Sequence, residues 1–254
     1  MIDVRDVPEG GLYSTPGPAG NRARNAESRG KANPDLYLAP MDTMNVIDLD
    51  AVRAAPTATA PYPHFTTVGT LKADAVPALM DDFPAITQPG FFPIDDVPVS
   101  GAFAALLDDL QSPEFSRTVG EKLGMDLVSR PTLITVRKWS RASDGTIHTD
   151  SVSKIATLLV YLNPTWGDTG EGRLRVLRND HDFNDYISEV SPTVGTIFAF
   201  KRTDSSWHGH LPFTGERRVV QITWLLDDSK VAHKRRLGKL SRWLKNIFRP
   251  KAAA

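Results

Sequence analysis

The feature that most constrains the fold is a change of sequence pattern at Pro131, from helical to strand-like. From there to Leu226 the chain runs through short segments rich in β-branched and aromatic residues, separated by glycine-containing loops and without a helical period. These segments are residues 132–139, 153–162, 173–177, 196–200 and 219–226. Evenly spaced strands without intervening helices are typical of an antiparallel sandwich or jelly roll. The sequence therefore predicts a mainly β fold with flanking helices (α+β) and a jelly-roll, or double-stranded β-helix, core.

Helical patterns precede these strands. Residues 72–82 carry a partial apolar face, and residues 100–110 repeat apolar side chains at spacings of three and four. A further helix is expected over residues 113–123, with Ser112 as a candidate N-cap.

Three regions follow from this reading. Residues 1–58 are rich in Pro, Gly, Ala, Asn and Asp and are predicted to be a poorly ordered extension, although residues 44–52 could add a short strand or helix to the body. Residues 59–228 are predicted to form the jelly-roll domain, and residues 229–254 a basic amphipathic helix.

Composition excludes several kinds of site. The chain has no cysteine, which rules out disulfides, zinc–thiolate sites, iron–sulfur clusters and a cysteine nucleophile. The N-terminus shows no apolar signal-peptide core, and no stretch approaches the length of a transmembrane helix. A cytoplasmic location is therefore expected.

Charge is distributed unevenly. Residues 229–254 hold nine of the 30 Lys and Arg and none of the 30 Asp and Glu, so the other 228 residues carry 21 basic against 30 acidic side chains, a formal charge of −9. The apolar stripe within residues 231–249 has helical spacing. Such a helix can make peripheral contact with an anionic membrane, bind an acidic partner or pack on its own jelly roll. Nucleic acid is not an expected partner, because no recognisable binding module or stacking platform is present.

Three residues suggest chemistry. His148 and Asp150 stand two apart, and on an extended strand i and i+2 point to the same face. His208 follows 58 residues after Asp150. Two imidazoles and one carboxylate are the facial triad that holds non-haem Fe(II) and leaves open positions. The plain alternative is that His148 and Asp150 form an ordinary surface pair.

Other residues compete for roles near this set. His210 is a second candidate for the distal ligand, and His208 is preferred because of its spacing to Arg218. Arg218 opens the last strand, where it could project inward and bind a carboxylate through a bidentate fork. Alternatively, Arg217 and Arg218 form a solvated pair on a turn. The strand before the His-X-Asp motif carries Arg137, Lys138 and Trp139, and alternate members could face the pocket. An Arg or Trp there could contact a substrate, although sheet packing explains Trp139 equally well.

Taken in order, these motifs resemble the 2-oxoglutarate- and Fe(II)-dependent dioxygenases, in particular the prolyl-4-hydroxylase-like branch. The resemblance covers about residues 61–227, and the ordered series is more specific than any one member. Its parts are residues 61–65 (PYPHF), 148–150 (HTD), 158–163 (LLVYLN) with Trp166, 170–176 (GEGRLRV), 194–200 (VGTIFAF), 207–212 (WHGHLP), 215–218 (GERR) and Trp224. Residues 170–172 depart from the paired glycines common at that position.

The resemblance implies roles for individual residues. His148, Asp150 and His208 would bind the iron, and Arg218 would bind the distal carboxylate of 2-oxoglutarate. Tyr161 would add a hydroxyl to that carboxylate, or else it is a core aromatic. The implied cofactors are Fe(II), 2-oxoglutarate as co-substrate and O₂, with ascorbate as a candidate reductant. The implied reaction hydroxylates an unactivated C–H of a peptidyl or small-molecule substrate and releases succinate and CO₂.

Two other classes of function are open at this point. A catalytically silent jelly-roll module could use the same pocket to bind a ligand. A membrane-surface protein could act mainly through its basic C-terminal helix.

Overall fold

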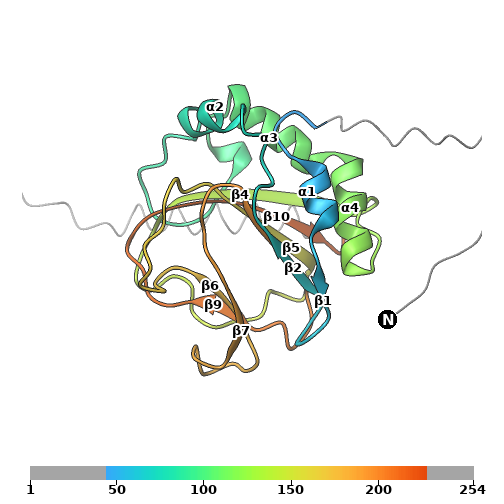
Figure 1. The fold of residues 1–254 in the computed structure, drawn as a ribbon, viewed down its shortest axis with the longest axis vertical. Helices are drawn as coiled ribbons and strands as arrows, with labels where there is room; N and C mark the ends of the chain where they lie inside the picture. Colours follow the sequence, from blue (N-terminus) through green and yellow to red (C-terminus); the bar gives the residue numbers. More distant parts are fainter. Residues whose placement is uncertain (1–43, 228–254) are drawn as a thin grey trace, which may run out of the picture. The chain divides into compact units, whose positions relative to one another are not determined.

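Two antiparallel sheets make up the fold in the computed structural model, which describes residues 44–227 (Figure 1). The larger sheet has the strand order β1-β2-β8-β5-β10-β4-β3, and the smaller has the order β7-β6-β9. The larger sheet consists of Thr57–Ala58 (β1), His64–Thr67 (β2), Thr196–Lys201 (β8), Lys154–Tyr161 (β5), Gly215–Leu225 (β10), Thr132–Ser140 (β4) and Phe92–Pro93 (β3). The smaller sheet consists of Tyr186–Val190 (β7), Leu174–Leu177 (β6) and His208–His210 (β9). The predicted mainly β jelly-roll architecture is confirmed.

Helices cover the outer face of the larger sheet, while β6, β7 and β9 lie on its other side (Figure 1). The helices are Leu49–Ala54 (α1), Val76–Asp81 (α2), Gly101–Gln111 (α3) and Pro113–Leu123 (α4), with a short 3₁₀ turn at Ile94–Asp96 (η1). The three predicted helices are present, the first shorter than expected. Ser112 caps α4, since its hydroxyl accepts the backbone N–H of Phe115 at 3.1 Å.

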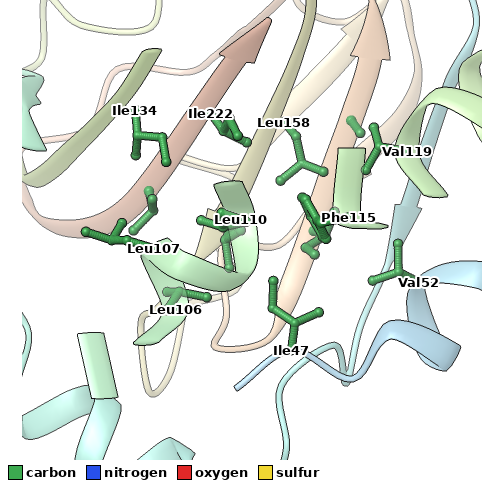
Figure 2. Packing of buried hydrophobic residues seen from close by; sticks show 14 of the residues in the cluster. Ile47, Val52, Leu106, Leu107, Leu110, Phe115, Val119, Ile134, Leu158 and Ile222 are labelled. Carbon is green, nitrogen blue, oxygen red and sulfur yellow. The ribbon is translucent and has the colours of Figure 1, made fainter. Parts of the chain in front are cut away.

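Alternation along the central strands separates two apolar clusters. On β5 and β10, even-numbered side chains such as Leu158 and Ile222 pack under the helices. Odd-numbered side chains such as Leu159 and Val219 face the smaller sheet. Figure 2 shows the helix-side cluster, with α3 and α4 side chains facing the sheet; its labelled members are Ile47, Val52, Leu106, Leu107, Leu110, Phe115, Val119, Ile134, Leu158 and Ile222.

The five strands predicted from the sequence all form, and two of the smaller sheet's strands were missed. Strand β7 has mostly exposed or half-buried side chains and no clear alternation of polar and apolar residues. Strand β9 is three residues long with a central glycine, which is too short for a periodic signal. Both are held by pairing with β6 rather than by their own composition.

The predicted boundary of the N-terminal extension needs correction. Residues 44–58 belong to the body: α1 buries Leu49 and Val52, and β1 pairs with β2. The Asp109 carboxylate on α3 accepts the backbone N–H groups of Asn45, Val46 and Ile47 at 2.7–2.9 Å, which secures this segment in the absence of a strong local pattern. Residues 1–43 and the expected basic helix lie outside the described residues.

Within residues 44–227, the structure contains no helix of the length and hydrophobicity that a membrane crossing requires.

Replacing Asp109 with Ala should reduce the free energy of unfolding by about 3 kcal/mol, because three backbone N–H groups, two of them buried, lose their acceptor. Asp109→Asn, which keeps one acceptor oxygen, should cost about half as much. Chemical denaturation measures both. The control is the neighbouring Asp108, whose side chain is exposed: Asp108→Ala should leave the free energy of unfolding nearly unchanged. Equal effects at the two positions would contradict this account.

Candidate metal centre

The centre is built on a backbone pairing between His148 and His208. The N–H of each residue donates to the carbonyl of the other at 3.0 Å, which makes them a hydrogen-bonded antiparallel pair. Directly opposite residues of such a pair project their side chains to the same face. The two imidazole rings consequently lie with their centroids 4.4 Å apart.

Asp150 completes the cluster from the same segment as His148. It stands two residues further on, so its side chain returns to the face that carries the imidazoles. One ligand atom from each of His148, Asp150 and His208 lies within 4.8 Å of the others. The structure thus brings together the three residues predicted as metal ligands, which come from the segment before β5 and from β9.

Hydrogen bonds fix the tautomer of each histidine. Nδ1 of His148 lies 2.7 Å from the carbonyl oxygen of Thr146, and Nδ1 of His208 lies 2.9 Å from that of Ser206. A carbonyl only accepts, so Nδ1 carries a proton in both rings and Nε2 is the nitrogen left to bind a metal. Burial lowers the pKa of His208 to about 4, and the ring is therefore neutral near pH 7. Imidazoles oriented by carbonyl acceptors through Nδ1 are suited to bind a metal through Nε2.

Asp150 is ionised despite its burial. Burial raises its pKa, but the Lys154 ammonium, His208 and the Thr157 hydroxyl together outweigh that effect and hold the pKa at about 2. Lys154 Nζ donates to one carboxylate oxygen at 2.5 Å, and Thr157 Oγ1 donates to the other at 2.5 Å. Sequence reasoning missed both partners; each stands on β5, and Thr157 follows the strand parity that turns residues toward the smaller sheet.

A cavity of about 220 Å³ opens beside these ligands. Its apolar wall includes Phe91, Leu159, Leu174 and Phe200, and its polar wall includes Arg137, Arg217, His210 and Gln221. His148, Asp150 and His208 also line this cavity, so these three residues would hold a metal beside the space that a further ligand could occupy.

Of the arginine pair on β10, Arg217 lines this cavity and the expected Arg218 does not. Arg218 is even-numbered on β10 and lies on the helix side, where it donates to Glu216 at 2.5 Å and lies over the ring of Phe83. Arg217 points the other way and is 3% exposed. The sequence indicated that the strand opens with an arginine pair. Which of the two arginines faces the cavity depends on a register shift between Glu216 and Val219, and no local sequence pattern predicts that shift.

Tyr161 and His210 also lie on the cavity side. Tyr161 is fully buried, and its hydroxyl accepts from Nη2 of Arg217 at 3.3 Å. It is thus at once a core aromatic and a partner of the cavity arginine. His210 shares a face with His208 on β9, but its Nε2 meets the loop at Gly145, and it is not part of the three-residue cluster.

The donor set fits Fe(II). Two imidazoles and an ionised carboxylate grouped together are the ligands of a facial triad, which leaves positions for further ligands. Closed structural zinc sites instead use four protein ligands, and this chain has no cysteine to supply them.

Replacing His208 with Ala should weaken metal binding more than about 100-fold, since outer-shell changes alone cost 10–100-fold. His210→Ala should change it little, because that ring lies outside the cluster. Anaerobic calorimetric titration of the metal-free chain with Fe(II) measures both variants. The ligand assignment would be overturned if His210→Ala lost metal and His208→Ala kept it.

Gly209 should tolerate no side chain. A Cβ there would lie 2.7 Å from the Gly145 carbonyl oxygen and 3.0 Å from that of Thr146, so the loop would have to move away from β9. We expect Gly209→Ala to disturb the His148–His208 pairing and weaken Fe(II) binding about tenfold or more. Gly167→Ala, where a Cβ meets nothing within 4 Å, is the matched control and should bind iron normally.

Comparison with known proteins agrees with this geometry. Residues 136–226 match the model of the 2OG-Fe(II) oxygenase superfamily, a span that contains all three predicted ligands. Over these residues the match confirms the resemblance to the 2-oxoglutarate- and Fe(II)-dependent oxygenase superfamily that the ordered motifs indicated. The expected cofactor set of Fe(II), 2-oxoglutarate and O₂ agrees with the match and with the donor set. Among curated proteins the comparison finds no match.

Several solved structures are similar over much of the chain. A prolyl-4-hydroxylase from Pseudomonas putida is 17% identical, with a TM-score of 0.47 over 70% of this chain and 96% of that chain. A prolyl 4-hydroxylase from Phytophthora capsici is 17% identical, with a TM-score of 0.45 over 70% of this chain and 68% of that chain. The viral collagen prolyl hydroxylase of Paramecium Bursaria Chlorella virus-1 is 15% identical, with a TM-score of 0.45 over 63% of this chain and 93% of that chain.

Proposed function

We propose that the protein is an Fe(II)- and 2-oxoglutarate-dependent oxygenase that hydroxylates an unactivated C–H bond of a small-molecule or peptidyl substrate. The observation that carries the proposal is that the His148, Asp150 and His208 cluster lines the same cavity as a buried arginine, Arg217. The superfamily match over residues 136–226 supports it.

When bound, Fe(II) with 2-oxoglutarate and O₂ supplies the oxidant for the hydroxylation and converts the co-substrate into succinate and CO₂. The chain's own residues bind, orient and shield. His148, Asp150 and His208 would hold the iron from one side. Phe200, which lies 4.6 Å from the His208 ring between centroids, and Leu159 keep water from the apolar wall.

Arg217 would bind the distal carboxylate of 2-oxoglutarate. Its Nε donates to the Gly172 carbonyl oxygen at 2.8 Å and its Nη2 to the Tyr161 hydroxyl at 3.3 Å, so the guanidinium is held in place. Within residues 44–227, no carboxylate forms a salt bridge with it. A buried guanidinium without a counter-ion is costly, and an anionic ligand would relieve that cost. This role replaces the one expected for Arg218.

A second candidate function is a catalytically silent ligand-binding module. The observation that favours it is the ion pair between Lys154 and Asp150, because both oxygens of the metal-ligand carboxylate already have donors without a metal. In such a module the lysine would take the structural place of the cation, and the cavity would bind a ligand without turnover.

Anaerobic Fe(II) titration in the presence of 2-oxoglutarate separates the two functions. We expect the weak visible charge-transfer band of an iron-chelated keto acid, and its loss in His148→Ala. A folded, metal-free chain that develops no band would overturn the oxygenase proposal and favour the silent module.

The same titration tests the arginine assignment with a matched pair. Arg217→Gln should raise the 2-oxoglutarate concentration that gives half of the maximal band intensity about 10- to 100-fold, because the charge-assisted hydrogen bonds from the guanidinium to the carboxylate are lost. Arg218→Gln should leave it nearly unchanged, since Arg218 lies on the helix side with Glu216. The reverse pattern would return the role to Arg218.

A further inference from the structure

The cavity contains a second buried arginine that the co-substrate does not account for. Arg137 on β4 is 8% exposed and lines the cavity with Arg217. Its Nε is buried and has no hydrogen-bond partner within residues 44–227. Its Nη1 donates to the Ser140 hydroxyl at 3.3 Å, and its guanidinium lies 4.1 Å from the centroid of the Phe91 ring.

Charge around Arg137 is poorly balanced. The only carboxylate within ion-pair distance in the described part of the chain is Asp144, whose oxygen lies 3.6 Å from Nη2 and already accepts the Arg141 backbone N–H at 3.0 Å. Burial lowers the pKa of Arg137 to about 10, with Asp144 opposing and Arg217 adding to that effect. The guanidinium is still charged near pH 7. Two buried cations in one cavity can therefore receive two anionic groups.

The two arginines face different surroundings. On β10, Val219 pairs with Tyr161 of β5 on one side and with Arg137 of β4 on the other. Tyr161 and Arg137 thus stand two strand spacings apart, about 9.5 Å between their strands. Arg217 bonds toward Tyr161, whereas Arg137 is bordered by Phe91 and by the loop that carries Asp144.

These different surroundings suggest that the two arginines bind different molecules. Arg217 is the more deeply buried of the two and is enclosed by strands, which suits a co-substrate common to every turnover. Arg137 borders two segments outside the central strands, and Phe91 and Asp144 there are both partly exposed. A second molecule that enters between those segments would meet Arg137 before Arg217.

We infer that Arg137 binds a free carboxylate of the molecule to be hydroxylated, so the substrate is a small carboxylic acid and not an internal residue of a peptide. This rests on the proposed function. The unpartnered Nε and an adjacent Nη lie on one edge of a planar fork, which matches the two oxygens of a carboxylate. An internal peptide residue has no backbone carboxylate to offer. A cavity of about 220 Å³ shared with the co-substrate also favours a small molecule.

The test uses the full chain with Fe(II) and saturating 2-oxoglutarate. The free protein-building L-amino acids are the first panel of carboxylates, and each is compared with its primary carboxamide, which has the same shape without the charge. Anaerobic calorimetry measures binding, and 2-oxoglutarate consumption in air measures turnover. At least one free acid should bind about 10- to 100-fold more tightly than its carboxamide and stimulate consumption.

Variants then assign that preference to Arg137. Arg137→Gln should weaken binding of the acid about 10- to 100-fold, remove the preference over the carboxamide and leave the 2-oxoglutarate titration unchanged. Arg137→Lys should restore part of the preference, because it keeps the charge without the fork. Lys138→Gln is the matched control: it removes a cation from the next position, whose nearest carboxylate is Glu216 at 3.9 Å, and should bind the acid normally.

Each contrary outcome has a distinct meaning. Equal binding of acids and carboxamides, a panel in which no free acid binds, or stimulation only by end-capped peptides or phosphate esters overturns the inference. So does Arg137→Gln if it weakens 2-oxoglutarate as Arg217→Gln does, since Arg137 would then belong to the co-substrate site. A wild-type chain that gives no keto-acid band fails at the earlier step and overturns the proposed function instead.

Discussion

The two hydrogen bonds between the backbones of His148 and His208 are the constraint on which the site depends. They align segments 60 residues apart in sequence, so that two imidazoles share one face and Asp150 follows two positions later. Gly209 lets the loop at Gly145 approach the opposite side of the same strand, with no room for a Cβ. The metal ligands are therefore placed by main-chain geometry, and their side-chain hydrogen bonds only select the tautomer.

Strand parity then distributes the remaining chemistry. The same central strands that pack Leu158 and Ile222 under the helices turn Tyr161, Thr157 and Arg217 toward the cavity. Charged groups on that face are buried in the space between the sheets, where low polarity strengthens every electrostatic interaction. The result is one carboxylate held ionised near the imidazoles and two guanidiniums on the polar wall.

Much of this was readable from the sequence because it depends on local patterns. The five central strands, the helix over residues 113–123 and the His-X-Asp spacing all have short-range signals. The features that the sequence did not predict depend on contacts between residues far apart in the chain. The choice between Arg217 and Arg218 requires the register of β10, including its irregularity. Residues 45–47 are held by the Asp109 carboxylate of α3, and β9 forms through its pairing with β6 and with His148.

The separation of the two apolar clusters has an evolutionary consequence. The helix-side cluster is the larger and contributes most of the buried aliphatic side chains, whereas the cavity wall belongs to the smaller cluster between the sheets. Substitutions that reshape the wall leave the larger cluster's packing intact, since the two are divided by a layer of hydrogen-bonded strands. Substitutions can therefore change the shape of the pocket with little loss in the free energy of unfolding, and this makes the architecture tolerant of functional divergence.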